Sequence, residues 1–232
     1  KFEHCGAKHE QLQNGSITTH MNHYVTQLKP IVSTEMSTSG EDILASAALA
    51  AMFVSLLGAL AWLTQGRPDI AIFVVALQRH NKGPNITHCK KCNRVLSYVK
   101  RKPMVFNVVA IVGLPWRIVC VSDSAYKVEG EGETRAMVGH MMLFMGTTPS
   151  EAPSGISVMT APMAPFGACS LIDFECRRQT RVRRSTFAAE IRGLNDATER
   201  GRVVQMASEE RFTGPISATT ALNMEEQEPE LF

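Results

Sequence analysis

Two carboxylates lie next to apolar segments, where an acidic side chain is unexpected unless it has a structural or chemical role. Asp123 closes the short β-branched run "RIVCVSD", and Glu190 follows Phe187 by three residues in the helical stretch "STFAAEIRGL". An Asp at the end of a strand either starts a turn, through a hydrogen bond to its own following backbone, or serves as a metal ligand. A Glu beside an apolar helical stripe either reaches solvent or requires a metal, an Arg or a raised pKa. The residue types alone leave these alternatives open.

Clustered arginines are the second feature that could do chemistry. Arg177, Arg178, Arg181, Arg183 and Arg184 lie within "RRQTRVRR", between a predicted strand and a predicted helix. Guanidinium groups pair well with phosphate oxygens, so the run is a candidate nucleic-acid contact, and a solvated basic turn is the alternative. The formal net charge of the chain is only +2. Any contact with a polyanion must therefore depend on this local concentration of charge.

The cysteines offer a third possibility, a metal site with sulfur ligands. "HCKKC" gives Cys89 and Cys92 a spacing found in zinc sites, but a structural zinc needs a second pair, and Cys169 and Cys176 make a poor one. On a helix, the first pair is simply two neighbours one turn apart. The six cysteines form no regular framework and follow no secretory signal, which favours reduced thiols and an intracellular location, cytoplasmic or nuclear.

The elements that precede these residues are expected to be mostly helical. Residues 1–32 predict a hairpin that turns at Asn14 and Gly15, then a short helix, and the polar residues 33–42 predict a linker. Ile43–Leu63 carries no charge and is long enough to span a bilayer, although its Ala, Ser and Gly content also fits a core helix. Two further helical segments follow, the first with Ile72, Val75 and Leu77 as its apolar side and the second with Cys92, Val95, Leu96 and Val99.

After Pro103 the pattern changes to short β-rich runs: "MVFNVVAIVGL", "WRIVCVSD", "AMVGHMMLFMG" and "CSLIDFECRRQ". His140 is expected to be a strand histidine whose polar atoms have partners, among core methionines, rather than a metal ligand. The Asp173 side chain is expected on the opposite face of its strand from Ile172 and Phe174. Residues 147–168 predict a long insertion between two strands. A helix follows with Ser185 as its N-cap and an apolar stripe of Phe187, Ile191, Leu194 and Thr198. The predicted fold class is α/β of the α+β type.

Several of these stretches, taken in order, resemble copia-type retrotransposon polyproteins. "LLGALAWLTQGRPDIA" and "CNRVLSYVKRKP" are similar to the end of the reverse transcriptase region, and "FEHCGAKHEQLQNGSITTHMNHYV" to the hairpin and helix after the polymerase palm. "CVSDSAYK" resembles the first strand of the family's ribonuclease H domain, and "SLIDFECRRQTRVRRSTFAAEIRGL" its third strand and first helix. The resemblance covers most of residues 1–205, and its most specific pieces are "RPDIA" and "RRSTFAAE".

The resemblance implies functions for the residues singled out above. Asp123 matches the family's first catalytic Asp and Glu190 its helix Glu, and together they would hold magnesium for hydrolysis of the RNA strand in an RNA–DNA hybrid. The five arginines would contact the phosphate backbone. The partners that it implies are an RNA–DNA hybrid and the remainder of the polyprotein. A membrane partner is disfavoured.

The departures from the family pattern are equally informative. A ribonuclease H-like site needs further acids, yet no predicted strand after Glu190 ends in Asp, and the polymerase motif "YxDD" is missing. The uncharged Ile43–Leu63 run is also unusually poor in polar residues for this family. A truncated or decayed copy of a mobile element would explain these departures. The start at Lys1, without an initiator Met, likewise suggests a fragment.

The sequence therefore predicts a polyprotein fragment that is catalytically incomplete. Residues 1–104 would be the end of the reverse transcriptase region, 105–205 a partial ribonuclease H-like domain with a truncated mixed sheet and one helix, and 206–232 a polar tail. The alternative, from another functional class, is a membrane-anchored protein in which residues 43–63 span the bilayer and the strand-rich remainder is a soluble domain.

Overall fold

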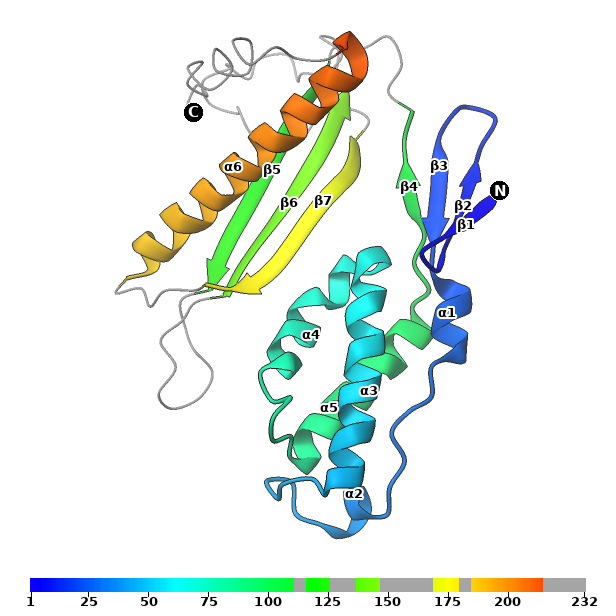
Figure 1. The fold of residues 1–232 in the computed structure, drawn as a ribbon, viewed down its shortest axis with the longest axis vertical. Helices are drawn as coiled ribbons and strands as arrows, with labels where there is room; N and C mark the ends of the chain where they lie inside the picture. The colour runs from blue at the N-terminus through cyan, green and yellow to red at the C-terminus, as the bar shows by residue number, and fades with distance from the viewer. Residues whose placement is uncertain (111–115, 126–136, 147–168, 180–184, 215–232) are drawn as a thin grey trace, which may run out of the picture. The chain divides into compact units, whose positions relative to one another are not determined.

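The computed structural model describes residues 1–110, 116–125, 137–146, 169–179 and 185–214. The chain divides into two compact units, Lys1–Ala110 with Cys176–Arg178, and Ile111–Glu175 with Gln179–Phe232. Helices and antiparallel sheets occupy separate stretches of the chain, so the fold class is α+β, as the sequence predicts (Figure 1). The predicted insertion at 147–168 lies outside the described residues.

The first unit contains a four-stranded antiparallel sheet. Its strands are β1 (Phe2–His4), β2 (Ala7–Gln11), β3 (Ile17–His20) and β4 (Phe106–Val108), in the order β1-β2-β3-β4. Gly15 closes the turn between β2 and β3 with a φ of 82°, a left-handed conformation that favours glycine. The hairpin expected at Asn14 and Gly15 is thus confirmed. Sequence reasoning placed residues from 105 onward in the second domain, but β4 pairs with β3 of the first unit.

Helices fill the rest of the first unit. They are α1 (Asn22–Gln27), α2 (Glu35–Thr38), α3 (Ala47–Leu63), the 3-10 turns η1 (Thr64–Gly66) and η2 (Pro68–Ile70), α4 (Ala71–Gln78) and α5 (Ile86–Arg101). α2 lies inside the stretch expected to be a linker. The Ser46 side chain caps α3 by accepting a hydrogen bond from the Leu49 N–H, and its own hydroxyl donates to Glu35 Oε2 at 2.6 Å. Together these bonds tie α2 to the start of α3.

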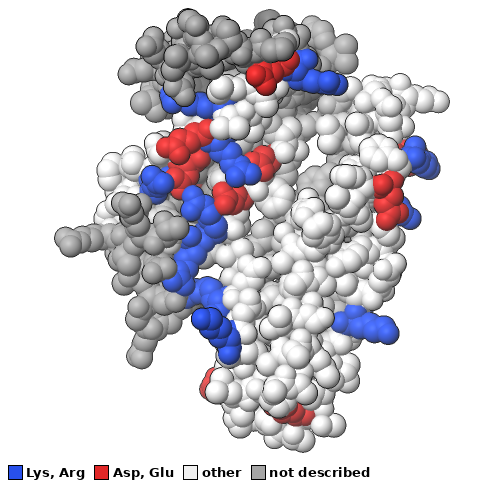
Figure 2. Space-filling view, viewed as in Figure 1, with Lys and Arg blue, Asp and Glu red and all other residues white. Residues whose placement is uncertain are grey.

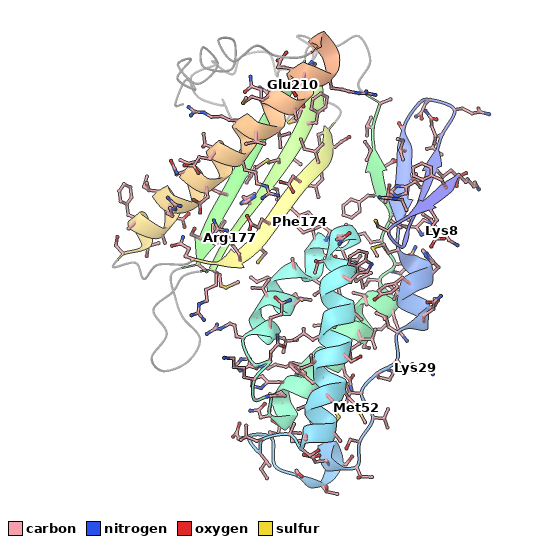
Figure 3. The ribbon with its side chains drawn as sticks, in the orientation of Figure 1. Lys8, Lys29, Met52, Phe174, Arg177 and Glu210 are labelled. Carbon is pink, nitrogen blue, oxygen red and sulfur yellow. The ribbon has the colours of Figure 1, made fainter. Side chains whose placement is uncertain are left out.

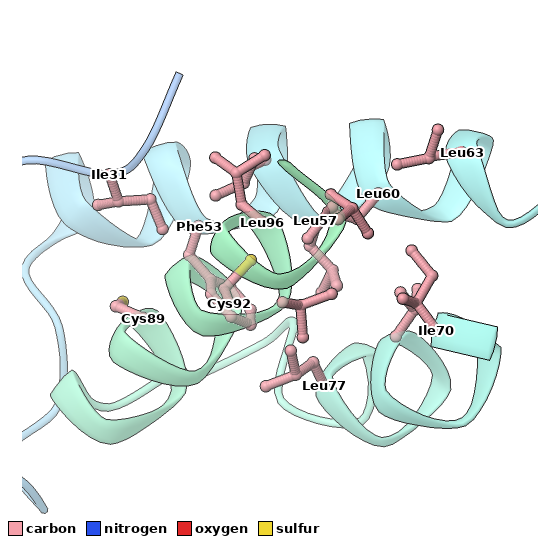
Figure 4. Packing of buried hydrophobic residues seen from close by; sticks show 14 of the residues in the cluster. Ile31, Phe53, Leu57, Leu60, Leu63, Ile70, Leu77, Cys89, Cys92 and Leu96 are labelled. Atoms are coloured by element: carbon pink, nitrogen blue, oxygen red, sulfur yellow. The ribbon is translucent and has the colours of Figure 1, made fainter. Parts of the chain in front are cut away.

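A single hydrophobic core joins the three long helical segments of the first unit (Figure 4). Its members include Leu49, Phe53, Leu57, Leu60, Leu63, Ile70, Val74, Leu77, Ile86, Cys89, Cys92, Val95, Leu96 and Val99. The apolar side predicted for α5 is confirmed. The side predicted for α4 is wrong in part, because Ile72 is exposed and Ala71, Val74 and Leu77 are buried. The η2 turn begins at Pro68 and leads directly into α4. Its last residue, Ile70, is buried in the core.

The second unit is a three-stranded sheet covered by one long helix. The strands β5 (Trp116–Ala125), β6 (Met137–Gly146) and β7 (Cys169–Arg178) lie in the order β5-β6-β7, and α6 (Thr186–Thr213) packs against β5 and β6. β5 and β6 pair antiparallel, with Asp123 opposite Gly139. The described sheet is antiparallel (Figure 1), so the expected mixed sheet is wrong. The Ser185 side chain accepts a hydrogen bond from the Ala188 N–H at 3.1 Å, which confirms this N-cap. α6 continues past residue 205, where the predicted domain ends.

The face by which α6 packs differs from the predicted apolar stripe. Phe187, Ile191 and Leu194 are exposed, Phe187 by 74%, while the buried positions are the small residues Ala189, Gly193, Ala197 and Gly201. An added Cβ at Gly193 would lie 2.7 Å from Ser124 Oγ, and one at Gly201 would lie 2.5 Å from Cys120 Sγ. Small residues therefore let the helix backbone lie close to the sheet, and the hydrophobic pattern alone assigned the wrong face.

Candidate nucleic-acid interface and carboxylate pair

Asp123 lies near the end of β5 with its side chain on the face of the sheet that α6 does not cover. The neighbouring Ser124 is buried, and its hydroxyl donates to the Ala189 carbonyl of α6 at 3.1 Å. Because successive strand residues point to opposite faces, Asp123 points away from the helix. Its exposure agrees with this orientation.

Glu190 lies on α6, directly after the fully buried Ala189, and is half-buried. The helix that carries Glu190 covers the opposite face of the sheet from Asp123. The two carboxylates thus lie on different elements, Asp123 on β5 and Glu190 on α6. In the part of the chain that the structure describes, no group of three or more His, Cys, Asp or Glu side chains could hold a metal ion.

The structure describes two of the five arginines of the basic run. Arg177 and Arg178 are half-buried at the end of β7, where Figure 3 labels Arg177. Arg181, Arg183 and Arg184 lie outside the described residues. On α6, Arg200 donates to Asp173 of β7 and Arg192 pairs with Asp196 at 2.8 Å, so acids on the unit itself already engage these two. Figure 2 shows acidic and basic side chains interspersed on this part of the surface. Arg177 and Arg178, with the arginines that follow them, form the basic run that the sequence singles out.

A polar row under α6 is a feature that sequence reasoning missed. His140 of β6 is only 4% exposed, and its Nε2 lies 3.7 Å from Glu175 Oε2 of β7. This Nε2 makes no hydrogen bond within the described structure and has the Glu175 carboxylate as its ion-pair partner. Side chains alternate between the two faces of a strand, so Glu175 lies on the same, helix-covered face of β7 as Asp173. This alternation is the sequence signal that could have predicted a charged partner for His140. Because α6 covers it, His140 is inaccessible to a substrate.

The Cys89 and Cys92 thiols are part of the hydrophobic core of the first unit. Both side chains are fully buried. Burial raises the pKa of both thiols, that of Cys92 to about 12, so without a metal both thiols are neutral. Their position supports core packing as the reason for the Cys-x-x-Cys spacing.

The uncharged segment forms α3, whose inner side supplies six buried side chains: Leu49, Phe53, Leu56, Leu57, Leu60 and Leu63. The stretch Ala47–Gly66 is long and apolar enough to cross a membrane, with a mean hydropathy of 2.0, and it is the one such helix among the described residues. A core helix passes the same test, so this finding is weak evidence for a membrane span.

A shallow groove of about 480 Å³ lies between the outer side of α3 and the segment Gln27–Ile31. Its lining includes Met52, Ser55 and Ala59 of α3 together with Leu28 and Lys29, and Figure 3 labels Met52 and Lys29. Lys29 is its single charged residue. The groove brings no acid, base and nucleophile together, so it offers no catalytic chemistry.

No protein-family model, curated protein or solved structure matches this chain. The class of protein is therefore defined by the structure alone: an α+β chain with a helical unit that carries a small sheet, and a second unit in which one helix covers an antiparallel sheet. The described residues contain a basic strand end, and no group of three or more of their His, Cys, Asp and Glu side chains could hold a metal ion.

Proposed function

We propose that this chain is part of a copia-type retrotransposon polyprotein and that its second unit binds RNA–DNA hybrid without cleaving it. One observation carries the proposal: three consecutive strands form a sheet in the order β5-β6-β7, and the next element, α6, covers one face. This is the order of elements expected for the first half of a ribonuclease H-like domain. The sequence resemblance of the same stretches supports it.

Hybrid binding would depend on the arginines at and after the end of β7. Five arginines occur between residues 177 and 184 without an intervening acid. Each guanidinium that contacts a phosphate releases counterions from the nucleic acid, so binding must weaken as salt rises. Cleavage is not expected, because the further acids that a ribonuclease H-like site needs are missing from the sequence pattern after Glu190.

The test is binding of a fluorescently labelled RNA–DNA hybrid to the full chain over a series of salt concentrations. The triple variant Arg181→Gln, Arg183→Gln, Arg184→Gln should bind at least about tenfold more weakly and with a shallower salt dependence. The matched control, Lys91→Gln, Arg94→Gln, Lys102→Gln, removes the same charge from exposed positions at α5 and its C-cap. Equal loss in both triples, or no binding by the parent chain, would contradict the proposal.

Cleavage is tested on the same hybrid with magnesium added. The parent chain should leave the RNA strand intact. Magnesium-dependent cutting that disappears in both Asp123→Asn and Glu190→Gln would show that the two carboxylates act together after all, and the non-cleaving part of the proposal would then be wrong.

A membrane-anchored protein is the second candidate, favoured by the hydropathy and the length of Ala47–Gly66. It predicts that the chain sediments with membranes and resists alkaline extraction. The polyprotein proposal predicts that alkaline extraction releases the chain from membranes. The six α3 side chains in the core favour release, because inserting α3 into a bilayer would remove them from their contacts with α4 and α5.

A further inference from the structure

The outer edge of β5 lacks a partner among the described strands. In the order β5-β6-β7, β5 is an edge strand of ten residues. On its outer side, every second residue presents backbone N–H and C=O groups that form no hydrogen bond with a described strand. Such an edge is a template for another strand unless charge, proline or a bulge guards it. β5 contains no proline, and its only charged residues are Arg117 and Asp123.

These two charges lie on the same face of the sheet. Arg117, Asp123 and the valines between them, Val119 and Val121, alternate with the residues that face α6. Arg117 and Asp123 are exposed, and Val121 is 41% exposed. The uncovered face of the edge strand therefore carries a positive end, an apolar middle and a negative end.

This pattern is complementary to itself in one register. If two copies of β5 pair antiparallel with Cys120 of each copy at the centre, Arg117 of one lies opposite Asp123 of the other, and Val119 lies opposite Val121. The two-fold symmetry makes each of these pairs twice. A slip by two residues loses both ion pairs, and an in-register parallel pairing places like charges together. We propose that a second copy of this chain adds to the edge of β5 in this antiparallel register and extends the sheet across the two chains.

The exposed side of α6 is consistent with this placement. Arg200 reaches Asp173 of β7, so its direction marks the side of the helix toward β7. At about 100° per residue, Ile191 and Leu194 lie roughly 120° to 180° around the helix from Arg200, away from β7 and on the side of the β5 edge. Both are exposed. A second chain that adds to β5 brings its own α6 to this side and covers apolar surface that the described parts of the unit leave in solvent.

The inference goes beyond hybrid binding and does not rest on it. The experiment measures the association state of the full chain by analytical ultracentrifugation, for the parent and for the single variants Arg117→Asp and Asp123→Arg. The parent should form a dimer. Each variant opposes like charges at both ion-pair positions, so its dimer dissociation constant should rise by about tenfold or more.

An equimolar mixture of the two variants is the decisive measurement. When Arg117→Asp meets Asp123→Arg in the proposed register, opposite charges face each other at both positions, so the mixture should form a heterodimer while each variant alone stays monomeric. Misfolded variants could not restore association in this way. A monomeric parent, variants that still dimerise alone, or a mixture that does not associate would overturn the proposal.

Discussion

Arg67 and Asp69 form a two-point ion pair in which the two partners differ sharply in burial. Arg67 Nε donates to Asp69 Oδ1 at 2.8 Å and Nη2 donates to Oδ2 at 2.7 Å. The Arg67 side chain is 3% exposed and that of Asp69 is 27% exposed. Arg67 also lies over the Tyr98 ring and donates to the Val99 carbonyl of α5, so the "RPD" turn is joined to the helix beside it. The pair raises the pKa of Arg67 and lowers that of Asp69.

This difference in burial predicts unequal effects of removing either partner. Asp69→Ala leaves a buried guanidinium without its carboxylate and should lower the free energy of unfolding by about 3 kcal/mol. Arg67→Met leaves a carboxylate that water can reach and should cost about 1 kcal/mol, mostly through lost hydrogen bonds. Lys90→Gln, which removes the exposed Lys90–Glu41 pair, is the control and should cost less than about 1 kcal/mol. Urea unfolding measures all three, and equal costs for the first two would contradict the argument.

The His88 side chain predicts a pH dependence of the first unit. Its Nδ1 accepts a hydrogen bond from the Asn85 N–H at 3.1 Å, and its ring stacks on His80 with a centroid distance of 3.6 Å. Burial, then His80 and Lys91, lower the pKa of His88 from 6.5 to about 4. The unfolded chain therefore takes up this proton first as the pH falls. The contribution of His88 to stability is complete above pH 6.5 and is lost progressively toward pH 4.

The variant His88→Gln isolates this contribution. Glutamine at the third position of the helix can still accept a hydrogen bond from the Asn85 N–H, but it does not titrate. Urea midpoints of the variant should fall less than those of the parent between pH 6.5 and pH 4. Parallel curves for the two proteins would show that protonation of His88 is not coupled to folding.

The close approach of α6 to the sheet predicts opposite effects for two Gly→Ala substitutions. At Gly193 the new Cβ would lie 2.7 Å from Ser124 Oγ and 3.0 Å from Val138 Cγ2, so the second unit should lose about 1 to 3 kcal/mol. Gly58, inside α3, has no atom within 4 Å of an added Cβ. Gly58→Ala should stabilise the first unit by about 0.5 to 1 kcal/mol, because Ala loses less backbone entropy in a helix. Hydrogen exchange of α6 and α3 amides reports on each unit separately.

The local signals of the sequence predicted most of the elements. Asn14 and Gly15 gave the hairpin, Ser185 the start of α6, and the helical period of Cys92, Val95 and Val99 the buried side of α5. These signals succeed because a turn, a cap or an amphipathic period depends on neighbours within a few residues. The pairing of β4 with β3 did not follow, because nothing local to Phe106–Val108 specifies a partner far away in the chain.

The site was harder to predict because it depends on which face each residue occupies. The carboxylate pair was inferred from the order of the elements, but the alternation of Ser122, Asp123 and Ser124 and the contact of Ser124 with Ala189 decide the direction of Asp123. On α6, hydrophobicity pointed to Phe187, Ile191 and Leu194, whereas close packing selected Ala189, Gly193 and Ala197. A stripe of small residues is the signal that should have been weighed against the apolar one.

The last prediction tests which face of α6 is buried. The double variant Ile191→Ser, Leu194→Ser removes apolar side chains that are exposed, so it should change the unfolding free energy of the second unit by less than about 1 kcal/mol and improve solubility. Ala197→Leu adds volume at a fully buried position and should destabilise the unit by about 1 to 3 kcal/mol. Thermal unfolding at a concentration where the parent is monomeric compares them without any contribution from association. If the double variant were the more damaging of the two, the apolar stripe rather than the small-residue face would be the one that packs on the sheet.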